Sequence, residues 1–208
     1  MSVEAKGLEM GLTNGILDEV TFRRLSPGEL TARAGRMILS AVGEDPTREG
    51  LLRTPERFSK ALMDLTSGYR KTPAEVVGEG VFQAEGPGLV SVRGTEFYSL
   101  CEHHVVPFWG TASVAYYPGS RILGLSKIPR LIELFSRRLQ VQERLGEQIA
   151  DALEELISPR AVVVRITARH LCMMMRGVEK QSAETVTETW RGLELLSQTE
   201  RDRIWESV

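Results

Sequence analysis

Residues able to bind a metal are concentrated in two short segments of this sequence. The chain has two cysteines and three histidines, and all of them lie in segments 101–104 and 170–172. Zinc takes thiolate sulfur and imidazole nitrogen as ligands, and a catalytic zinc keeps one position open for water or substrate. The pattern predicts one metal site that draws on both segments. The candidate ligands are Cys101, His103, His104, His170 and Cys172.

A tetrahedral ion cannot hold all five candidates, so some of them must have another role. If the second segment lies on a strand, His170 and Cys172 project from the same face. The adjacent His103 and His104 point in different directions, so we expect one of them to bind metal. Two thiolates and one imidazole would leave a fourth position open. The remaining histidines would then serve in proton transfer, because imidazole changes charge near neutral pH.

Three other interpretations fit the same five residues. A closed Cys2His2 structural zinc site uses the same inventory, but two segments separated by about 65 residues are not typical of a small zinc finger. A disulfide between Cys101 and Cys172 is disfavoured in a cytoplasmic protein, where thiols stay reduced. Cysteines that only fill the core, with solvated histidines, would require rare residues to cluster by accident.

The composition predicts one domain with a helical extension and excludes several classes of partner. Lys and Arg number 26 against 28 Asp and Glu, so no charge excess indicates nucleic acid or a membrane surface. The longest apolar runs are too short to span a bilayer. The start, MSVEAKGLEMGL, lacks the basic and apolar regions of a signal peptide. We expect a cytoplasmic protein without nucleic-acid or membrane partners.

Helices are predicted in the first third of the chain. Residues 1–25 show no firm period and are expected to form an arm. Ser26-Pro27-Gly28-Glu29 is typical of a helix start, with Ser as the N-cap, and this helix is expected to end near Val42. A second helical region follows Asp45-Pro46-Thr47 and extends to about residue 68. Thr54-Pro55 interrupts its pattern and favours two shorter helices.

From residue 86 the periodicity changes. Alternating and β-branched segments predict strands, and apolar stripes at helical spacing predict helices. The expected order is strands over 89–100 and 105–117, helices over 129–139 and 141–157, and strands over 161–176 and 185–190. This order predicts an α+β fold with an antiparallel sheet.

A possible phosphate site lies where the second strand joins the following helix. Ser126 can cap this helix, and Lys127 and Arg130 lie near its positive end, which suits an anion. Surface cations of this kind are more often only solvated. Arg176 strengthens the interpretation if it points into the same cleft.

The helix over 141–157 opens with Gln142 and Glu143. An acid in the first turn can simply interact with the helix dipole. It can also accept hydrogen bonds from the amino group and ring N–H of a nucleobase.

These segments together resemble the GTP cyclohydrolase I family over roughly residues 26–192. Several uncommon motifs occur in the family's order, which makes the resemblance specific. They are CEHH at 101–104, GLSKIPR at 124–130, QVQERL at 140–145, HLCMMMRG at 170–177 and SAETVT at 182–187.

The resemblance implies Cys101, His104 and Cys172 as zinc ligands and leaves His103 and His170 for catalysis. It also implies that guanine, ribose and triphosphate are bound by a further set of residues. These are Gln142 and Glu143 for guanine, and Ser126, Lys127, Arg130 and Arg176 for triphosphate and ribose.

The implied reaction converts GTP and water to formate and 7,8-dihydroneopterin triphosphate, the first step of a folate or other pterin pathway. Zinc lowers the pKa of its bound water to roughly 7, which supplies hydroxide for attack on guanine C8. His170 is the candidate proton donor at N7, and His103 is assigned to ribose opening and sugar rearrangement. The sequence does not separate these two roles, which can be exchanged.

The implied fold is the T-fold, a four-stranded antiparallel sheet with two helices inserted between strands 2 and 3, preceded by N-terminal helices. We expect an arm over 1–25, a helical region over 26–85 and a catalytic domain over 86–208. The family forms a homodecamer of two stacked pentamers with active sites shared between subunits. Two alternatives are a pterin synthase or nitrile reductase on the same fold, and a non-catalytic zinc-stabilised module.

Overall fold

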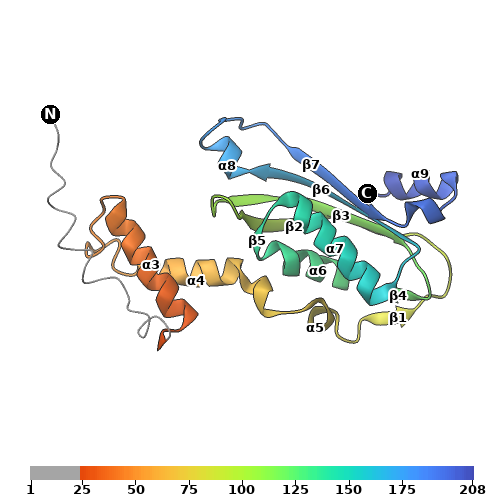
Figure 1. Ribbon diagram of the computed structural model, residues 1–208, viewed down its shortest axis with the longest axis horizontal. Helices are drawn as coiled ribbons and strands as arrows, with labels where there is room; N and C mark the ends of the chain where they lie inside the picture. Colours follow the sequence, from red (N-terminus) through yellow and green to blue (C-terminus); the bar gives the residue numbers. More distant parts are fainter. Residues whose placement is uncertain (1–23) are drawn as a thin grey trace. The chain divides into compact units, whose positions relative to one another are not determined.

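A computed structural model of the protein describes residues 24–208 (Figure 1). The arm was predicted over residues 1–25, and its residues 1–23 lie outside the described part of the chain. The chain divides into two compact units, with the boundary between Met63 and Asp64. Within residues 24–208, no helix is long and apolar enough to cross a membrane.

The first unit contains α3 (Pro27–Ala41) and most of α4 (Thr54–Leu65). The predicted cap of α3 is confirmed: the Ser26 hydroxyl accepts from the Glu29 N–H, and the Glu29 carboxylate accepts from the Ser26 N–H at 2.8 Å. Helix α4 begins at the predicted interruption, since Pro is tolerated in a first turn but not inside a helix. The residues before it form turns where a helix was predicted, so that part of the prediction is wrong.

The second unit is built on a five-stranded sheet with the order β5-β2-β3-β6-β7 (Figure 1). Its strands are β2 (Val90–Cys101), β3 (Pro107–Tyr117), β5 (Leu139–Gln140), β6 (Ala161–His170) and β7 (Thr185–Arg191). The four long strands pair antiparallel, as predicted. The sheet differs from the prediction in one strand, because β5 pairs parallel with the end of β2. A strand this short has no alternation from which to predict it.

Several short elements complete the second unit. Strand β1 (Val81–Gln83) pairs with β4 (Arg121–Leu123) as a separate two-stranded sheet. The others are the 3-10 helices η1 (Ser67–Arg70) and η2 (Leu193–Leu195) and the helices α5 (Pro73–Val77), α8 (Leu171–Met174) and α9 (Gln198–Glu206).

Helices α6 (Lys127–Ser136) and α7 (Gln142–Ile157) follow β3 in the chain and pack against one face of the sheet (Figure 1). The predicted apolar stripe of α7 is confirmed, because Leu145, Ile149 and Leu153 are fully buried. Alternate residues of β6 face opposite sides of the sheet. The set beginning at Val162 joins the core under α6 and α7, and the set beginning at Ala161 joins a second core with α9.

Strand β6 ends at His170, six residues before the predicted end, and Cys172 lies on α8. The cause is the partner strand: His170 pairs with Phe108, and β3 begins one residue earlier at Pro107. Residues beyond His170 would therefore find almost no further residues of β3 with which to pair. The expectation that His170 and Cys172 share one strand face is therefore wrong, and the turn into α8 places Cys172 instead.

Candidate metal centre

Cys101, His104 and Cys172 come together in the folded chain. One ligand atom from each, a sulfur or a ring nitrogen, lies within 4.8 Å of the others. Cys101 ends β2, His104 follows it in the turn to β3, and Cys172 belongs to α8 after β6. The sheet brings the two segments together because β3 pairs with β2 on one side and with β6 on the other.

A tight turn after β2 places the two adjacent histidines. The Cys101 carbonyl accepts from the Val105 N–H at 2.8 Å, and the Cys101 N–H donates to the Val106 carbonyl at 2.9 Å. Within this turn, Nδ1 of His103 lies 3.7 Å from the Cys101 sulfur, and Nδ1 of His104 lies 3.8 Å from it. Distance to Cys101 alone does not distinguish them. The group that includes Cys172 contains His104.

The centre combines a buried side with an exposed side. Cys101 is buried and Cys172 is half-buried, whereas His104 is exposed. Burial, and then the neighbouring Cys101 sulfur, raise the pKa of the Cys172 thiol, while the charge of Arg176 acts in the opposite direction.

The imidazole ring of His170 contacts Phe108 through its face and Gln142 through its Nε2 edge. Its ring stacks on Phe108 with a centroid distance of 4.6 Å and an interplanar angle of 2°. Its Nε2 lies 2.8 Å from Oε1 of Gln142, the first residue of α7. Burial lowers the pKa of His170, and the carboxylate of Glu143 acts in the opposite direction. Gln142 therefore contacts His170 directly, and its neighbour Glu143 is exposed in the first turn of α7.

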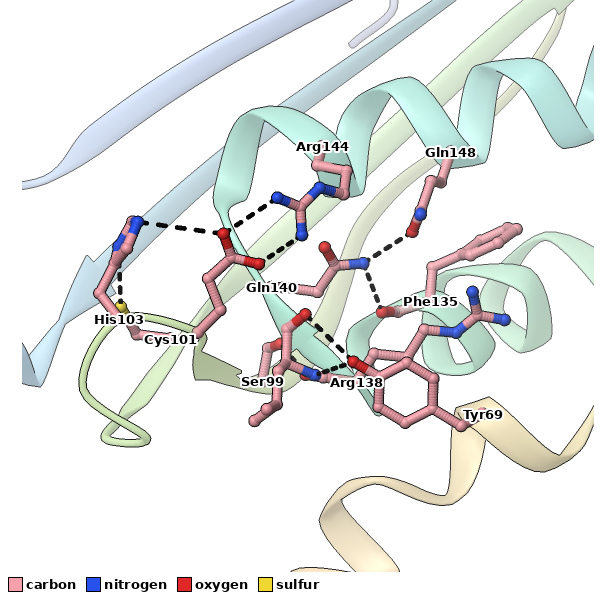
Figure 2. A network of polar contacts seen from close by, with 11 residues as sticks. Tyr69, Ser99, Cys101, His103, Phe135, Arg138, Gln140, Arg144 and Gln148 are labelled. Atoms are coloured by element: carbon pink, nitrogen blue, oxygen red, sulfur yellow. Dashed lines mark hydrogen bonds and ion pairs between the residues drawn. The ribbon is translucent and has the colours of Figure 1, made fainter.

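Two residues of the centre were missed by sequence reasoning. The Glu102 carboxylate accepts from Nη1 and Nη2 of Arg144 at 2.5 and 3.0 Å, and it lies 3.9 Å from Nε2 of His103 (Figure 2). Arg144 holds the pKa of Glu102 below its ordinary value. Glu102 lies in the motif CEHH and Arg144 in the motif QVQERL, so their positions in these motifs could have indicated a role. Their pairing could not be predicted, because the two motifs are remote in the sequence.

Ser126, Lys127 and Arg130 lie apart from the metal centre. Lys127 begins α6 directly after β4, whereas the other end of α6 leads into β5, which pairs with Cys101. A helix of ten residues is about 15 Å long, so α6 separates the two groups.

The start of α6 has its own surroundings. The Lys127 side chain passes over Gly80, where an added Cβ would lie 2.2 Å from its Cε. Arg130 lines a cavity of about 680 Å³ together with other residues of the second unit. These include Ser67, Arg70, Lys71, Glu133 and Arg137.

Comparison of sequences with known proteins gives one consistent result. A family model described as GTP cyclohydrolase I matches residues 31–208. GTP cyclohydrolase 1 of Deinococcus radiodurans is 60% identical over 158 residues, which cover 76% of this chain and 73% of that protein. The Chlorobaculum tepidum protein of the same name is 53% identical over 164 residues, covering 79% and 73%. The Leptospira biflexa protein of that name is 51% identical over 171 residues, covering 82% and 93%. Among solved structures, the archaeosine synthase QueF-Like in the apo form covers 52% of this chain and 97% of its own, at 18% identity and a TM-score of 0.41.

Proposed function

The chain belongs to the GTP cyclohydrolase I family, and we propose that its catalytic centre is the cluster of Cys101, His104 and Cys172. The enzyme converts GTP and water to formate and 7,8-dihydroneopterin triphosphate. The observation that carries the placement of the centre is the convergence of three ligand atoms within 4.8 Å from two remote segments.

The donor set fits zinc. Two thiolates and one imidazole suit a borderline-soft divalent ion, and three protein ligands are typical of catalytic zinc with one position left for water or substrate. The burial pattern supports such an open position, because His104 is exposed while Cys101 is buried. A closed structural site would require a fourth side chain. His103 is the other imidazole within 4 Å of Cys101, and we assign it to proton transfer instead.

Zinc held by these three residues would supply Lewis-acid activation of water near neutral pH. His170 protonates N7 of guanine, which makes C8 electrophilic, and its ring is held by Phe108 and Gln142 for that purpose. His103, which is exposed next to the cluster, moves protons during ribose opening and the rearrangement that builds the pterin ring.

Substrate binding is proposed for residues around this centre. Glu143 is exposed in the first turn of α7, on the His170 side, where its carboxylate accepts from the guanine amino group and ring N–H. Arg176, whose charge is felt at Cys172, binds the triphosphate or the ribose.

Ser126, Lys127 and Arg130 are proposed to bind triphosphate in the active site of a neighbouring subunit. The length of α6 separates them from the metal centre of their own chain, which supports this assignment. The proposed assembly is a homodecamer of two stacked pentamers. Its subunits would have the T-fold, with residues 86–208 as the catalytic domain and residues 26–85 as the helical region. We also propose a cytoplasmic location and the first step of a folate or other pterin pathway.

The test is turnover by the purified, zinc-loaded protein. With GTP as substrate, we expect equal amounts of formate and of the pterin, measured by its fluorescence after oxidation. Cys172→Ala serves as the comparison, since it removes one ligand of the cluster. If the zinc-free variant produced formate at the rate of the unmodified protein, the placement of the catalytic centre would be wrong.

A further inference from the structure

Gln142 has almost no contact with solvent, and its amide group is fully oriented by the fold. Its exposed fraction is 1%. Its Nε2 donates to the carbonyl oxygens of Ile166 at 3.0 Å and Thr185 at 2.9 Å, and lies 3.1 Å from the Thr187 hydroxyl. An amide has two N–H hydrogens and a carbonyl oxygen can only accept, so both hydrogens are directed at the backbone of β6 and the start of β7. The opposite orientation would turn Oε1 towards two carbonyl oxygens, which the hydrogen-bond network excludes.

The amide orientation determines which ring nitrogen of His170 carries a proton. Because Oε1 of Gln142 is an acceptor, the Nε2 that lies 2.8 Å from it must be the donor. The stacked ring of Phe108, which is itself fully buried, fixes the plane in which this bond forms. In the neutral ring the proton therefore stays on Nε2, and the lone pair is on Nδ1.

We propose that Gln142 is a positioning residue that keeps a proton on Nε2 of His170, so that the imidazolium gives its Nδ1 proton to guanine N7 and the ring that remains is the neutral Nε2–H tautomer. The proposal rests on the proposed catalytic role of His170. It replaces the guanine contact that the family resemblance implies for Gln142, because a buried amide with both hydrogens in use is withdrawn from the substrate. Guanine binding on α7 then depends on the exposed neighbour Glu143.

The tautomer can be measured directly in the unmodified enzyme. Zinc-loaded protein labelled with ¹⁵N-histidine has three imidazoles, and the signals lost in His170→Ala identify those of His170. We expect a protonated Nε2 and an unprotonated Nδ1 at a pH where the ring is neutral. A proton on Nδ1 would overturn the proposal whatever the activity of the enzyme. This measurement needs no change at position 142, so it remains decisive even if variants there fail to fold.

Two variants separate positioning from substrate contact. Gln142→Met keeps the length of the side chain but removes the acceptor. Gln148→Met is the control, because Gln148 lies on the same helix and accepts from Gln140 instead of facing His170. In Gln142→Met we expect mixed tautomers and a kcat about 10- to 100-fold lower, with an unchanged KM and zinc content.

The possible outcomes distinguish a failure of the positioning role of Gln142 from a failure of the catalytic role of His170. A raised KM with unchanged kcat in Gln142→Met would show a direct guanine contact and overturn the positioning role. If the tautomer of His170 were unchanged in Gln142→Met, the positioning role would also be overturned. If instead His170→Ala turned over GTP normally, the proposed catalytic role of His170 would fail, while the ¹⁵N spectrum would still decide whether Gln142 sets the tautomer.

Discussion

Arg144 grips the Glu102 carboxylate with two hydrogen bonds, and so ties the turn that carries both adjacent histidines to the helix that begins with Gln142. A planar guanidinium facing a carboxylate in this way fixes orientation as well as distance. Arg144 keeps the pKa of Glu102 low, so the carboxylate is ionised, and it lies 3.9 Å from Nε2 of His103. This distance is beyond hydrogen-bond range, so the Glu102 carboxylate acts on His103 through its charge.

Arg144→Ala should lower activity while leaving zinc content unchanged. Without Arg144 the Glu102 carboxylate loses its fixed orientation, and we expect turnover about tenfold slower, as for other residues that orient a catalytic side chain. Arg48→Ala is a suitable control, since it removes an exposed ion pair with Glu44 in the first unit. The measurements are the turnover rate and the zinc content of both variants. If Arg144→Ala and Arg48→Ala turned over GTP at equal rates, Arg144 would have no role in orienting Glu102 for catalysis.

Cys172→Ala should lose bound zinc and turnover together. Two remaining ligands hold zinc far more weakly than three, so the ion should be lost on dialysis. The measurement is metal content by mass spectrometry beside the rate of formate release. Met173→Leu, a change of similar volume on the same short helix, is the control. Full zinc retention by Cys172→Ala would contradict the ligand set.

Glu143→Ala should weaken the binding of GTP without loss of metal. Removal of a hydrogen-bonding carboxylate is worth about 1.5–3 kcal/mol, which corresponds to a KM roughly ten- to a hundredfold higher. Glu155→Ala, an exposed acid on the same helix, should leave KM unchanged. Steady-state kinetics and zinc analysis of both variants test this, and an unchanged KM for Glu143→Ala would place the guanine elsewhere.

Lys127→Ala and Cys172→Ala should complement each other when the two chains are co-expressed. Each variant alone would be inactive or nearly so. If the phosphate-binding residues serve a neighbouring subunit, some sites in the mixed assembly combine an intact Lys127 with an intact Cys172, and activity returns. No recovery from mixed assemblies, verified by two affinity tags, would show that each chain builds its own site.

Glu147 should stabilise the protein only above acidic pH. It lies between Arg191 and Thr189 of β7, and Arg191, followed by the Thr189 hydroxyl, holds its pKa below the ordinary value. Because the folded pKa is below the unfolded one, the stabilisation is present above the unfolded pKa of about 4.3 and is lost as pH falls through the folded pKa. The pair is half-exposed, so Glu147→Gln should cost at most about 1 kcal/mol at neutral pH. Thermal unfolding at neutral and acidic pH tests this, since a loss that persisted in acid would have another cause.

Long periodic segments and capping motifs could be predicted from the sequence. The Ser26 cap of α3, the buried stripe of α7 and the antiparallel order of the four long strands all follow from local patterns that agree with the final packing. The candidate ligands were also visible, because five rare residues occupy only two short segments.

The remaining features depend on partners that are remote in the sequence. Strand β6 ends where β3 begins, which no pattern near His170 could reveal. The short strand β5 exists because the end of β2 offers it a pairing edge. The buried state of Gln142 likewise follows from acceptors on β6 and β7, not from its own neighbours.

The pairing of Phe108 with His170 has a consequence for maturation of the enzyme. A slip of β6 by one residue against β3 would turn His170 to the other side of the sheet and shift the chain leading to Cys172 by about 3.3 Å. A misaligned chain would not bring Cys101, His104 and Cys172 together. The convergence of these three residues within 4.8 Å therefore depends on correctly registered strands.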